Sequence, residues 1–336
     1  MTSHEKPSLA IVAFREIVLG KRGLIKVNLL WLPMATYLSF LVPEKGQERV
    51  LLFVLIFLSI SFWALGNILA NDLCDFKIDL EAGKQRWICA LRPQIGAALV
   101  ALIFAVGLGI QIFGGSWASL GSYAGATALG LGYSLKPFRF KEHGAWGVFA
   151  YSLACALAYV AVPYFWMRSE AIWLIILFPI VLLDKWVNLH FHQILDYDAD
   201  LSRGINTLAV RSGLSGARKW LTIMSIVSSI AFVLCFIHIA RQLPGWFVPI
   251  TVLGGAVLAV AFLFTRASKT RSNEGTSLVQ ELPWPYLGMT LVLFRMLPGF
   301  LLFRLALLDD RMWVGVVIAF VLLGLESLYN LRYRYE

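Results

Sequence analysis

The sequence has little charge for its length and no cysteine pattern that would form a cross-link or a metal site. Only 15% of its 336 residues are charged, whereas soluble proteins carry about 25%. Its four cysteines, Cys74, Cys89, Cys155 and Cys235, are scattered without CxxC spacing, which excludes a disulfide framework and a zinc-binding motif. The first 26 residues lack a short apolar core that ends at small residues, so we expect no cleavable signal peptide.

Apolar residues take the place of the missing charge. They make up 59% of the chain, against about 45–50% in soluble proteins, which is too many for one buried core and indicates a surface in contact with lipid. We therefore predict an all-α, polytopic membrane helix bundle that forms a single domain over residues 1–336. The expected spans are 24–42, 50–71, 94–113, 116–134, 146–166, 171–193, 217–240, 245–265, 284–308 and 311–330.

The basic residues orient this bundle. A net charge of +9 would suggest nucleic acid in a soluble protein, but here the charge lies between apolar runs, so we expect no nucleic-acid partner. If both termini lie in the cytoplasm, most of the 29 Lys and Arg residues lie on that side, as the positive-inside rule requires. The polar loops at about 72–93, 194–216 and 266–283 then also face the cytoplasm, which favours this face of an inner-membrane-type protein as the active one. The basic residues expected outside are Lys45, Arg49, Arg168, Arg241 and Arg311.

A weak repeat divides the chain. Helices one to four and five to eight each place an acidic cluster after their second helix and a basic loop after their fourth. We therefore expect two pseudo-repeated four-helix halves around a central cavity. Transporters show similar repeats, so the repeat alone does not select a function.

The first acidic cluster comprises Asn71, Asp72, Asp75 and Asp79, at the expected cytoplasmic end of the second helix. At about 100° per residue, steps of four advance only about 40° round a helix, so these side chains share one face. Carboxylates on one stripe repel each other and raise each other's pKa, and a helix C-terminus disfavours anions further. A divalent cation would remove that conflict, and oxygen ligands without His or Cys favour Mg²⁺ over zinc.

A second cluster, Asp196 and Asp200, ends the sixth helix, and a basic segment, Lys136 to Lys141, follows the fourth. Either cluster alone could be a solvated helix end; two of them, in a chain with only 20 acidic residues, favour a metal site. The basic segment is ordinary positive-inside flanking by itself. With Arg86 it becomes a plausible diphosphate clamp, because Arg binds phosphate oxygens bidentately.

These elements indicate one reaction. Two Mg²⁺ ions would bridge the carboxylates and a diphosphate, and basic residues would neutralise charge on the leaving group as the allylic C–O bond ionises. The carbocation needs an apolar, aromatic wall, and 14% of the chain is aromatic.

The ordered set of motifs resembles the UbiA superfamily of intramembrane prenyltransferases over about residues 20–270, with C-terminal helices at about 284–330. The resemblance implies about nine helices around a central cavity and Mg²⁺-dependent transfer of a prenyl group from a polyprenyl diphosphate to a lipophilic acceptor, first of all an aromatic quinone precursor. It implies that Asp72, Asp75, Asp79, Asp196 and Asp200 are the metal ligands and catalytic residues. The expected substrate-binding residues are Asn71, Arg86, Tyr133, Arg139, Lys141, Asn188, His192, Gln193 and Arg203.

This sequence departs from the family pattern at Gln193, where many members carry an acidic residue, and at Phe76, where many carry Arg. Both departures concern the acceptor more than the metal chemistry. A tetrapyrrole, a glycerol-phosphate lipid or a carotenoid end group stay open as acceptors. Two other functions also stay open: a membrane terpene cyclase that quenches the same cation internally, and an ion-coupled secondary transporter.

Overall fold

The structure is a computed structural model that describes residues 46–81, 86–167 and 170–242, and isolated positions further on: 244–246, 248–249, 256, 285–286, 297, 301, 303–304, 306–307, 313 and 317. These residues fall into two compact units, and we describe each by itself. Unit 1 contains the described residues up to Arg139 together with 157–167. Unit 2 contains 140–156 and the described residues from Glu170 to Val317.

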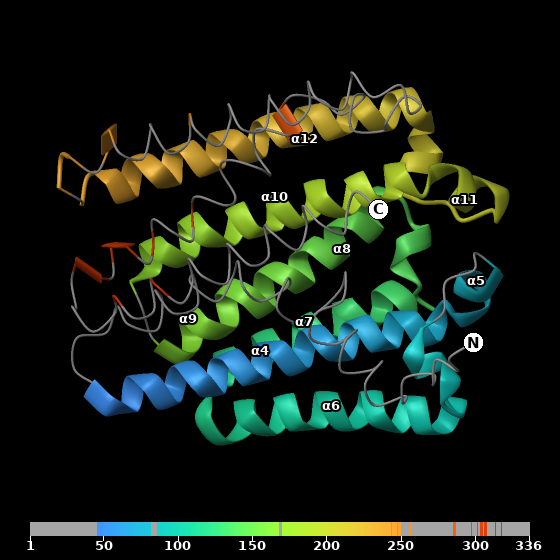
Figure 1. The fold of residues 1–336 in the computed structure, drawn as a ribbon, viewed down its shortest axis with the longest axis horizontal. Coiled ribbons are helices and arrows are strands. Elements are labelled where there is room, and N and C mark those ends of the chain that lie inside the picture. Colours follow the sequence, from blue (N-terminus) through green and yellow to red (C-terminus); the bar gives the residue numbers. More distant parts are fainter. Residues whose placement is uncertain are drawn as a thin grey trace, which may run out of the picture. The chain divides into compact units, whose positions relative to one another are not determined.

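Unit 1 is built round a long helix, α4 (Gly46–Cys74), which packs along α6 (Pro93–Gly114) and also contacts α7 (Trp117–Ser134) (Figure 1). A short helix, α5 (Phe76–Glu81), follows α4, and a 3-10 turn, η2 (Trp87–Ala90), precedes α6. The unit closes with η4 (Leu157–Ala161), a turn of π-helix, and α9 (Val162–Met167), both against α7.

The helix ends of unit 1 follow from local sequence. Pro93 stands in the first turn of α6, where its missing N–H costs nothing. Ser116 caps α7 by accepting a hydrogen bond from the Ser119 backbone N–H. Small residues then let the helices approach: a Cβ on Gly107 of α6 would lie 2.0 Å from the Tyr123 hydroxyl of α7. Close contact through glycine is a common device between membrane helices.

Unit 2 contains three long helical segments that lie side by side (Figure 1). Helix α10 (Ala171–Leu195) packs between α8 (Ala145–Ala156) and α12 (Leu208–Ala240). The short helix α11 (Tyr197–Ser202) links α10 to α12, and the 3-10 turn η3 (Phe140–Glu142) precedes α8. The Trp173 indole is buried among these elements, beside the ring of His238.

The described residues contain five helices long and apolar enough to cross a membrane: Val54–Cys74, Pro93–Gly114, Ala145–Met167, Ala171–Leu195 and Leu208–Ala240. They match five expected spans. The expected span 116–134 is also a helix, but it is rich in Gly, Ala and Ser and is not among the five. The expected spans 24–42, 245–265, 284–308 and 311–330 lie largely outside the described residues, as do the total helix count and the repeat.

One predicted boundary was wrong. We expected the seventh span to begin at about 217, after a polar loop at about 194–216; the helix begins at Leu208. Thr207 caps it by accepting a hydrogen bond from the Val210 N–H, so a polar first segment can stay helical. Gly213 adopts φ 67° and ψ 158° and kinks the helix where the apolar span starts.

The outward faces are apolar. Leu102, Ile112 and Phe113 of α6 are exposed, and so are Ile230 and Leu234 of α12. In water such an apolar surface would favour aggregation. In a membrane the same side chains contact lipid, so their exposure carries no free-energy penalty. Several polar residues of the spans, such as Gln111 and Asp184, are instead buried, as expected for a membrane protein.

Candidate functional site

The first acidic cluster lies where α4 ends and α5 begins. Asp75 is the single turn residue between the two helices, but its N–H bonds to the Asn71 carbonyl at 2.9 Å and the Asp79 N–H bonds to the Asp75 carbonyl at 2.8 Å. The helical path therefore continues through the motif and keeps the predicted spacing. Asp72 and Asp79 are buried, 6% and 8% exposed, and Asp75 is half-buried.

Arginines neutralise these carboxylates. The Arg86 Nε lies 3.2 Å from Asp79 Oδ2, within hydrogen-bond range, and 3.8 Å from Asp72 Oδ1. Arg139 Nη2 lies 3.8 Å from Asp75 Oδ1. Arg139 is held at φ 36°, in the left-handed region that costs a non-glycine residue about 1 kcal/mol or more. One arginine thus spans two aspartates and a second reaches the third.

Two further side chains support the cluster. The Ser134 hydroxyl, at the end of α7, donates to the Asn71 Oδ1 at 2.9 Å, which fixes the amide beside Asp72. The Cys89 thiol lies 3.5 Å from the Asp72 backbone carbonyl. Burial raises the pKa of Cys89, and the charges of Asp72 and Asp79 raise it further, against the opposite effect of Arg86. The negative charge of the cluster therefore also affects the neighbouring Cys89 thiol.

The second acidic cluster lies between α10 and α11 in unit 2. Asp196 is the residue at which α10 stops, with φ −93° and ψ 8°, and it is exposed. The Asp200 N–H bonds to the Asp196 carbonyl at 2.8 Å, so this motif also keeps its one-turn spacing. Asp200 is half-buried and accepts a hydrogen bond from the Thr207 hydroxyl, with Lys141 and Arg203 as the nearby positive charges.

Burial raises the pKa of Asp200 from its usual 3.8 to about 6, and the negative charge of Asp196 adds to this effect. The Thr207 hydroxyl, Lys141 and Arg203 act in the opposite direction. Each of these two carboxylates makes ionisation of the other less favourable. A divalent cation bound to both would remove this repulsion.

Contacts from the start of α12 hold the segment that contains Lys141. Gly144 forms a parallel bridge with Thr207, and the Arg211 guanidinium donates to the Glu142 carbonyl at 2.9 Å. Gly204 turns the chain between α11 and α12 at φ 67°, a conformation that glycine adopts freely. The segment after the second motif therefore anchors η3, and Lys141 within it is only 8% exposed.

The residues of the predicted basic clamp belong to both units. Arg139 pairs with Asp75 in unit 1, whereas Lys141, two residues later, lies near Asp200 in unit 2. Among the other predicted substrate-binding residues, Tyr133 is half-buried at the end of α7 and Arg203 closes α11. The basic segment therefore serves both acidic clusters instead of one.

The remaining predicted residues lie on α10. Asn188 donates to Asp184, to its Oδ1 at 2.8 Å and its carbonyl at 2.9 Å, and Lys185 Nζ lies 3.2 Å from Asp184 Oδ2. His192 is exposed, whereas Gln193 is buried. Asn188 thus donates to the buried carboxylate of an Asp184–Lys185 ion pair within the membrane span, and neither of these two hydrogen bonds reaches the acidic clusters.

Two residues at the clusters were given no role of their own from the sequence, Ser134 and Thr207. Thr207 carries a signal that could have been used: a Thr before an apolar run marks a helix N-cap, and the helix start fixes the hydroxyl beside Asp200. Ser134 carries no comparable signal, because its contact with Asn71 joins residues 63 positions apart.

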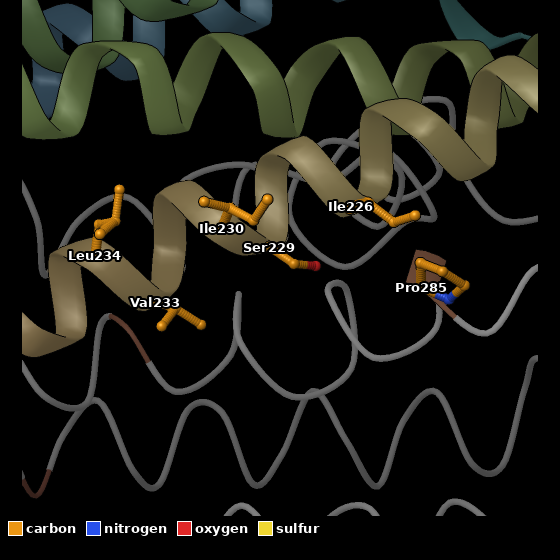
Figure 2. A pocket seen from close by; sticks show the side chains of 6 residues that line it. All are labelled: Ile226, Ser229, Ile230, Val233, Leu234 and Pro285. Carbon is orange, nitrogen blue, oxygen red and sulfur yellow. The ribbon is translucent and has the colours of Figure 1, made fainter.

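An apolar groove lies on α12, lined by Ile226, Ser229, Ile230, Val233, Leu234 and Pro285 (Figure 2). None of these six side chains is ionisable, and the Ser229 hydroxyl already donates to the Ser225 carbonyl at 2.7 Å. The groove can hold hydrocarbon, but it offers nothing that would bind a diphosphate.

The donor set fits Mg²⁺. Each cluster offers carboxylate oxygens, and the first adds an amide oxygen at Asn71; Mg²⁺ prefers such ligands. Within the described ranges no three His, Cys, Asp or Glu side chains converge into a ready metal cage. Mg²⁺ does not need one, because it is usually held by one or two carboxylates together with substrate phosphates and water.

Known proteins show the same fold. A structure of a UbiA homologue from Archaeoglobus fulgidus bound to DMAPP and Mg²⁺ has a TM-score of 0.57 and 20% identity, covering 85% of this chain and 97% of that one. The same homologue bound to GPP and Mg²⁺ has a TM-score of 0.56. A digeranylgeranylglyceryl phosphate synthase has a TM-score of 0.52 and 16% identity, over 88% of this chain and 98% of that one. No curated protein sequence matches the chain.

The family model of the UbiA prenyltransferase family matches residues 31–280, which includes both acidic clusters and the basic segment between them. This confirms the resemblance seen in the motifs. The chain belongs to the UbiA prenyltransferase family and is an integral membrane prenyltransferase that acts on a prenyl diphosphate.

Proposed function

We propose that this enzyme transfers the prenyl group to a lipophilic aromatic acceptor, and that its two acidic clusters each hold one Mg²⁺ ion against the diphosphate. Asp72, Asp75 and Asp79 would hold one ion, and Asp196 and Asp200 the other. The observation that carries the proposal is that each cluster keeps its own cationic side chains at the carboxylates: Arg86 and Arg139 in unit 1, Lys141 and Arg203 in unit 2.

The reaction would follow from these charges. Mg²⁺ held by the five aspartates would offset charge on the diphosphate and on the carboxylates. Arg86, Arg139 and Lys141, no longer the only counter-charges of the aspartates, then donate to the diphosphate oxygens. As the allylic C–O bond breaks, the diphosphate leaves with the electron pair, and these residues stabilise the charge that it gains. A ring carbon of the acceptor bonds to the carbocation and afterwards loses its proton.

Apolar aromatic surroundings would protect the carbocation from water. In unit 1 the buried Trp63 ring packs edge-on against Tyr159, with 5.5 Å between the centroids. Trp63 lies eight residues before Asn71 on α4, which is about two helical turns from the acidic cluster. Aromatic faces attract cations, so this pair supports an apolar, aromatic environment along the same helix.

Paired substitutions in α11 test the metal role. In Asp200→Asn, Mg²⁺-dependent prenyl transfer by the purified enzyme should fall at least about 100-fold, because a metal ligand is lost. Asp198→Asn removes an exposed carboxylate from the same short helix and should keep near wild-type activity. Equal activity of the two variants would refute the assignment of Asp200.

The cyclase alternative uses the same ionisation and needs its own test. The purified enzyme is incubated with geranylgeranyl diphosphate and Mg²⁺ but without an acceptor. We expect no cyclic product. A cyclic hydrocarbon or alcohol would overturn the transferase proposal while leaving the metal site intact.

A further inference from the structure

Three polar groups buried along one face of α10 have no hydrogen-bond partner in the described part of the chain. They are the indole Nε1 of Trp186, the Nδ1 of His190, and both the Nε2 and Oε1 of Gln193. His190 is fully buried and Gln193 is 4% exposed. Buried polar atoms without partners each carry a desolvation cost, so three in succession on one helix call for an explanation.

Their spacing puts them on one stripe. Residues 186, 190 and 193 stand at i, i+4 and i+7, within about 60° of each other round the helix. The stripe is about 10 Å long at 1.5 Å per residue, and it ends three residues before Asp196. It therefore extends from the second acidic cluster into the membrane span, over a length that a ring system can occupy.

Hydrogen-bond chemistry defines what the stripe could bind. The His190 Nε2 lies 2.9 Å from the Ala217 carbonyl; a carbonyl only accepts, so Nε2 carries the proton and Nδ1 of the neutral ring is an acceptor. Gln193 adds one acceptor and an N–H₂ donor, and Trp186 adds an N–H donor. The Gln193 amide is near enough to the His190 ring for a weak hydrogen bond from Nε2 to Nδ1, and such a bond leaves Gln193 Oε1 and Trp186 Nε1 unpaired.

An aromatic surface flanks the stripe. Trp186 packs edge-on against Phe149 of α8 at 6.5 Å, Phe149 lies 5.5 Å from Trp146, and Trp146 lies 6.2 Å from Phe140, all between ring centroids. Phe140 directly precedes Lys141. All these residues belong to unit 2. Flat rings beside paired donors and acceptors favour a flat ligand that carries hydroxyl groups.

We infer that Trp186, His190 and Gln193 form the binding site for the hydroxyl groups of an aromatic acceptor. The inference rests on the proposed function and assigns to it a subsite and an acceptor chemistry. An acceptor hydroxyl donates to His190 Nδ1 or Gln193 Oε1 and accepts from Gln193 Nε2 or Trp186 Nε1. The glutamine can both donate to and accept from a hydroxyl, whereas the ionised carboxylate that many family members carry at this position can only accept.

A matched pair of glutamines tests the inference. Gln111 of α6 is as buried as Gln193, 1% exposed, but is fully bonded: its Nε2 donates to Ser59 at 2.7 Å, and its Oε1 accepts from Ser119 at 2.5 Å and Trp166 at 2.6 Å. Gln111→Leu should therefore lower the Tm and leave ligand responses unchanged. Gln193→Leu should keep or raise the Tm, because it removes unpaired polar atoms.

The probe is hydroquinone, added to the detergent-purified enzyme with Mg²⁺ and inorganic diphosphate. We expect hydroquinone to raise the Tm of the wild type and its dimethyl ether, which cannot donate, to have no effect. Gln193→Leu should weaken the apparent affinity for hydroquinone about tenfold or more, as loss of one hydrogen bond predicts. If Gln193→Leu does not fold, Gln193→Met gives the same comparison with an unbranched side chain.

Three results would overturn the inference: a wild type that does not respond to hydroquinone, Gln193 variants that respond like the wild type, or a Gln193→Leu variant as destabilised as Gln111→Leu. The proposed function has a separate readout, the rise in Tm that Mg²⁺ with diphosphate alone produces. Loss of that rise in the wild type would count against the donor site, whereas its presence without a hydroquinone response would count only against the acceptor subsite.

Discussion

At the scale of single residues, each acidic cluster brings carboxylates close together, and basic side chains offset their negative charge only in part. Arg86 lies between two aspartates and Arg139 reaches a third, while burial and the charge of Asp196 raise the pKa of Asp200 to about 6. In both clusters, basic side chains lie beside the carboxylates. A bound cation could take over part of their role in offsetting the negative charge. The chemistry therefore depends on side-chain type and position more than on net charge.

The shape of Arg86 should be needed, and not only its charge. Arg86→Lys keeps the charge, but a single ammonium group cannot match the planar fork that serves two carboxylates or a diphosphate. We expect prenyl transfer to fall about tenfold or more, mainly through a higher KM for the prenyl diphosphate. Arg92→Lys, at an exposed position before α6, is the control and should behave like the wild type in the same steady-state assay.

The pKa of Asp200 predicts the pH dependence of metal binding. Its value of about 6 in the folded protein lies above the usual 3.8, so the folded state holds this proton more tightly than the unfolded chain. Without metal, this contribution to stability is fully present below about pH 4 and is lost as the pH rises through about 6. Mg²⁺ competes with the same proton, so stabilisation by Mg²⁺ should be small at pH 5 and grow through pH 6.

Thermal unfolding with and without Mg²⁺, measured across this pH range, checks the prediction. In Asp200→Asn no proton is exchanged at this position, so the step near pH 6 should disappear. A Mg²⁺ effect that is independent of pH in the wild type would contradict the assigned titration.

At the scale of elements, short segments hold the clusters in place. Gly147 of α8 lies against η3, so that a Cβ added to it would stand 2.1 Å from the Phe140 carbonyl oxygen and 3.1 Å from the Lys141 Cα. These are backbone atoms and cannot rotate away. Helix α8 therefore sets the position of η3 and, through it, of Lys141.

Gly147→Ala should displace η3. We expect a loss of about 1–3 kcal/mol in the free energy of unfolding, typical of overpacking, and a lower rate of prenyl transfer because Lys141 moves relative to Asp200. Gly109→Ala in α6 is the control: nothing lies within 4 Å of its added Cβ, so the helix should gain up to about 1 kcal/mol. Equal Tm and activity for the two variants would contradict the role given to Gly147.

At the scale of the whole molecule, polar and apolar side chains are distributed differently from those of a soluble protein. Apolar side chains such as Leu102 and Leu234 face outward, while a bonded network around Gln111 and an ion pair at Asp184 are buried inside. Lipid supplies no hydrogen bonds, so every polar group within the spans must find a partner in the protein or in a ligand. This constraint is what makes the unpaired groups on α10 informative.

Reporter fusions test the predicted orientation. The positive-inside rule puts both termini in the cytoplasm and the end of α12 outside. A fluorescent protein that matures only in the cytoplasm should therefore fluoresce when fused after Glu336 and stay dark when fused after Gln242. Fluorescence in the opposite pattern would reverse the orientation and place the acidic clusters outside.

Much of the fold and the spacing of the carboxylate motifs could be predicted from the sequence, because both depend on local rules. The length of an apolar run predicts a span, and five of the expected spans match observed ones within a few residues, apart from the start of α12. Spacing round a helix predicts that Asp75 and Asp79, or Asp196 and Asp200, share a face, and the backbone hydrogen bonds keep that spacing. The motif order likewise identified the family.

Only the tertiary structure decided which distant residues meet. Nothing in the sequence joins Ser134 to Asn71, divides Arg139 and Lys141 between two acidic clusters, or shows that the Gln111 amide is fully bonded while that of Gln193 is not. Helical periodicity fixes the face of a side chain, but the partner on that face depends on how helices far apart in the chain pack. The sequence by itself therefore determined the membrane fold and the carboxylate motifs, and the packing of the helices determined the partners of those motifs.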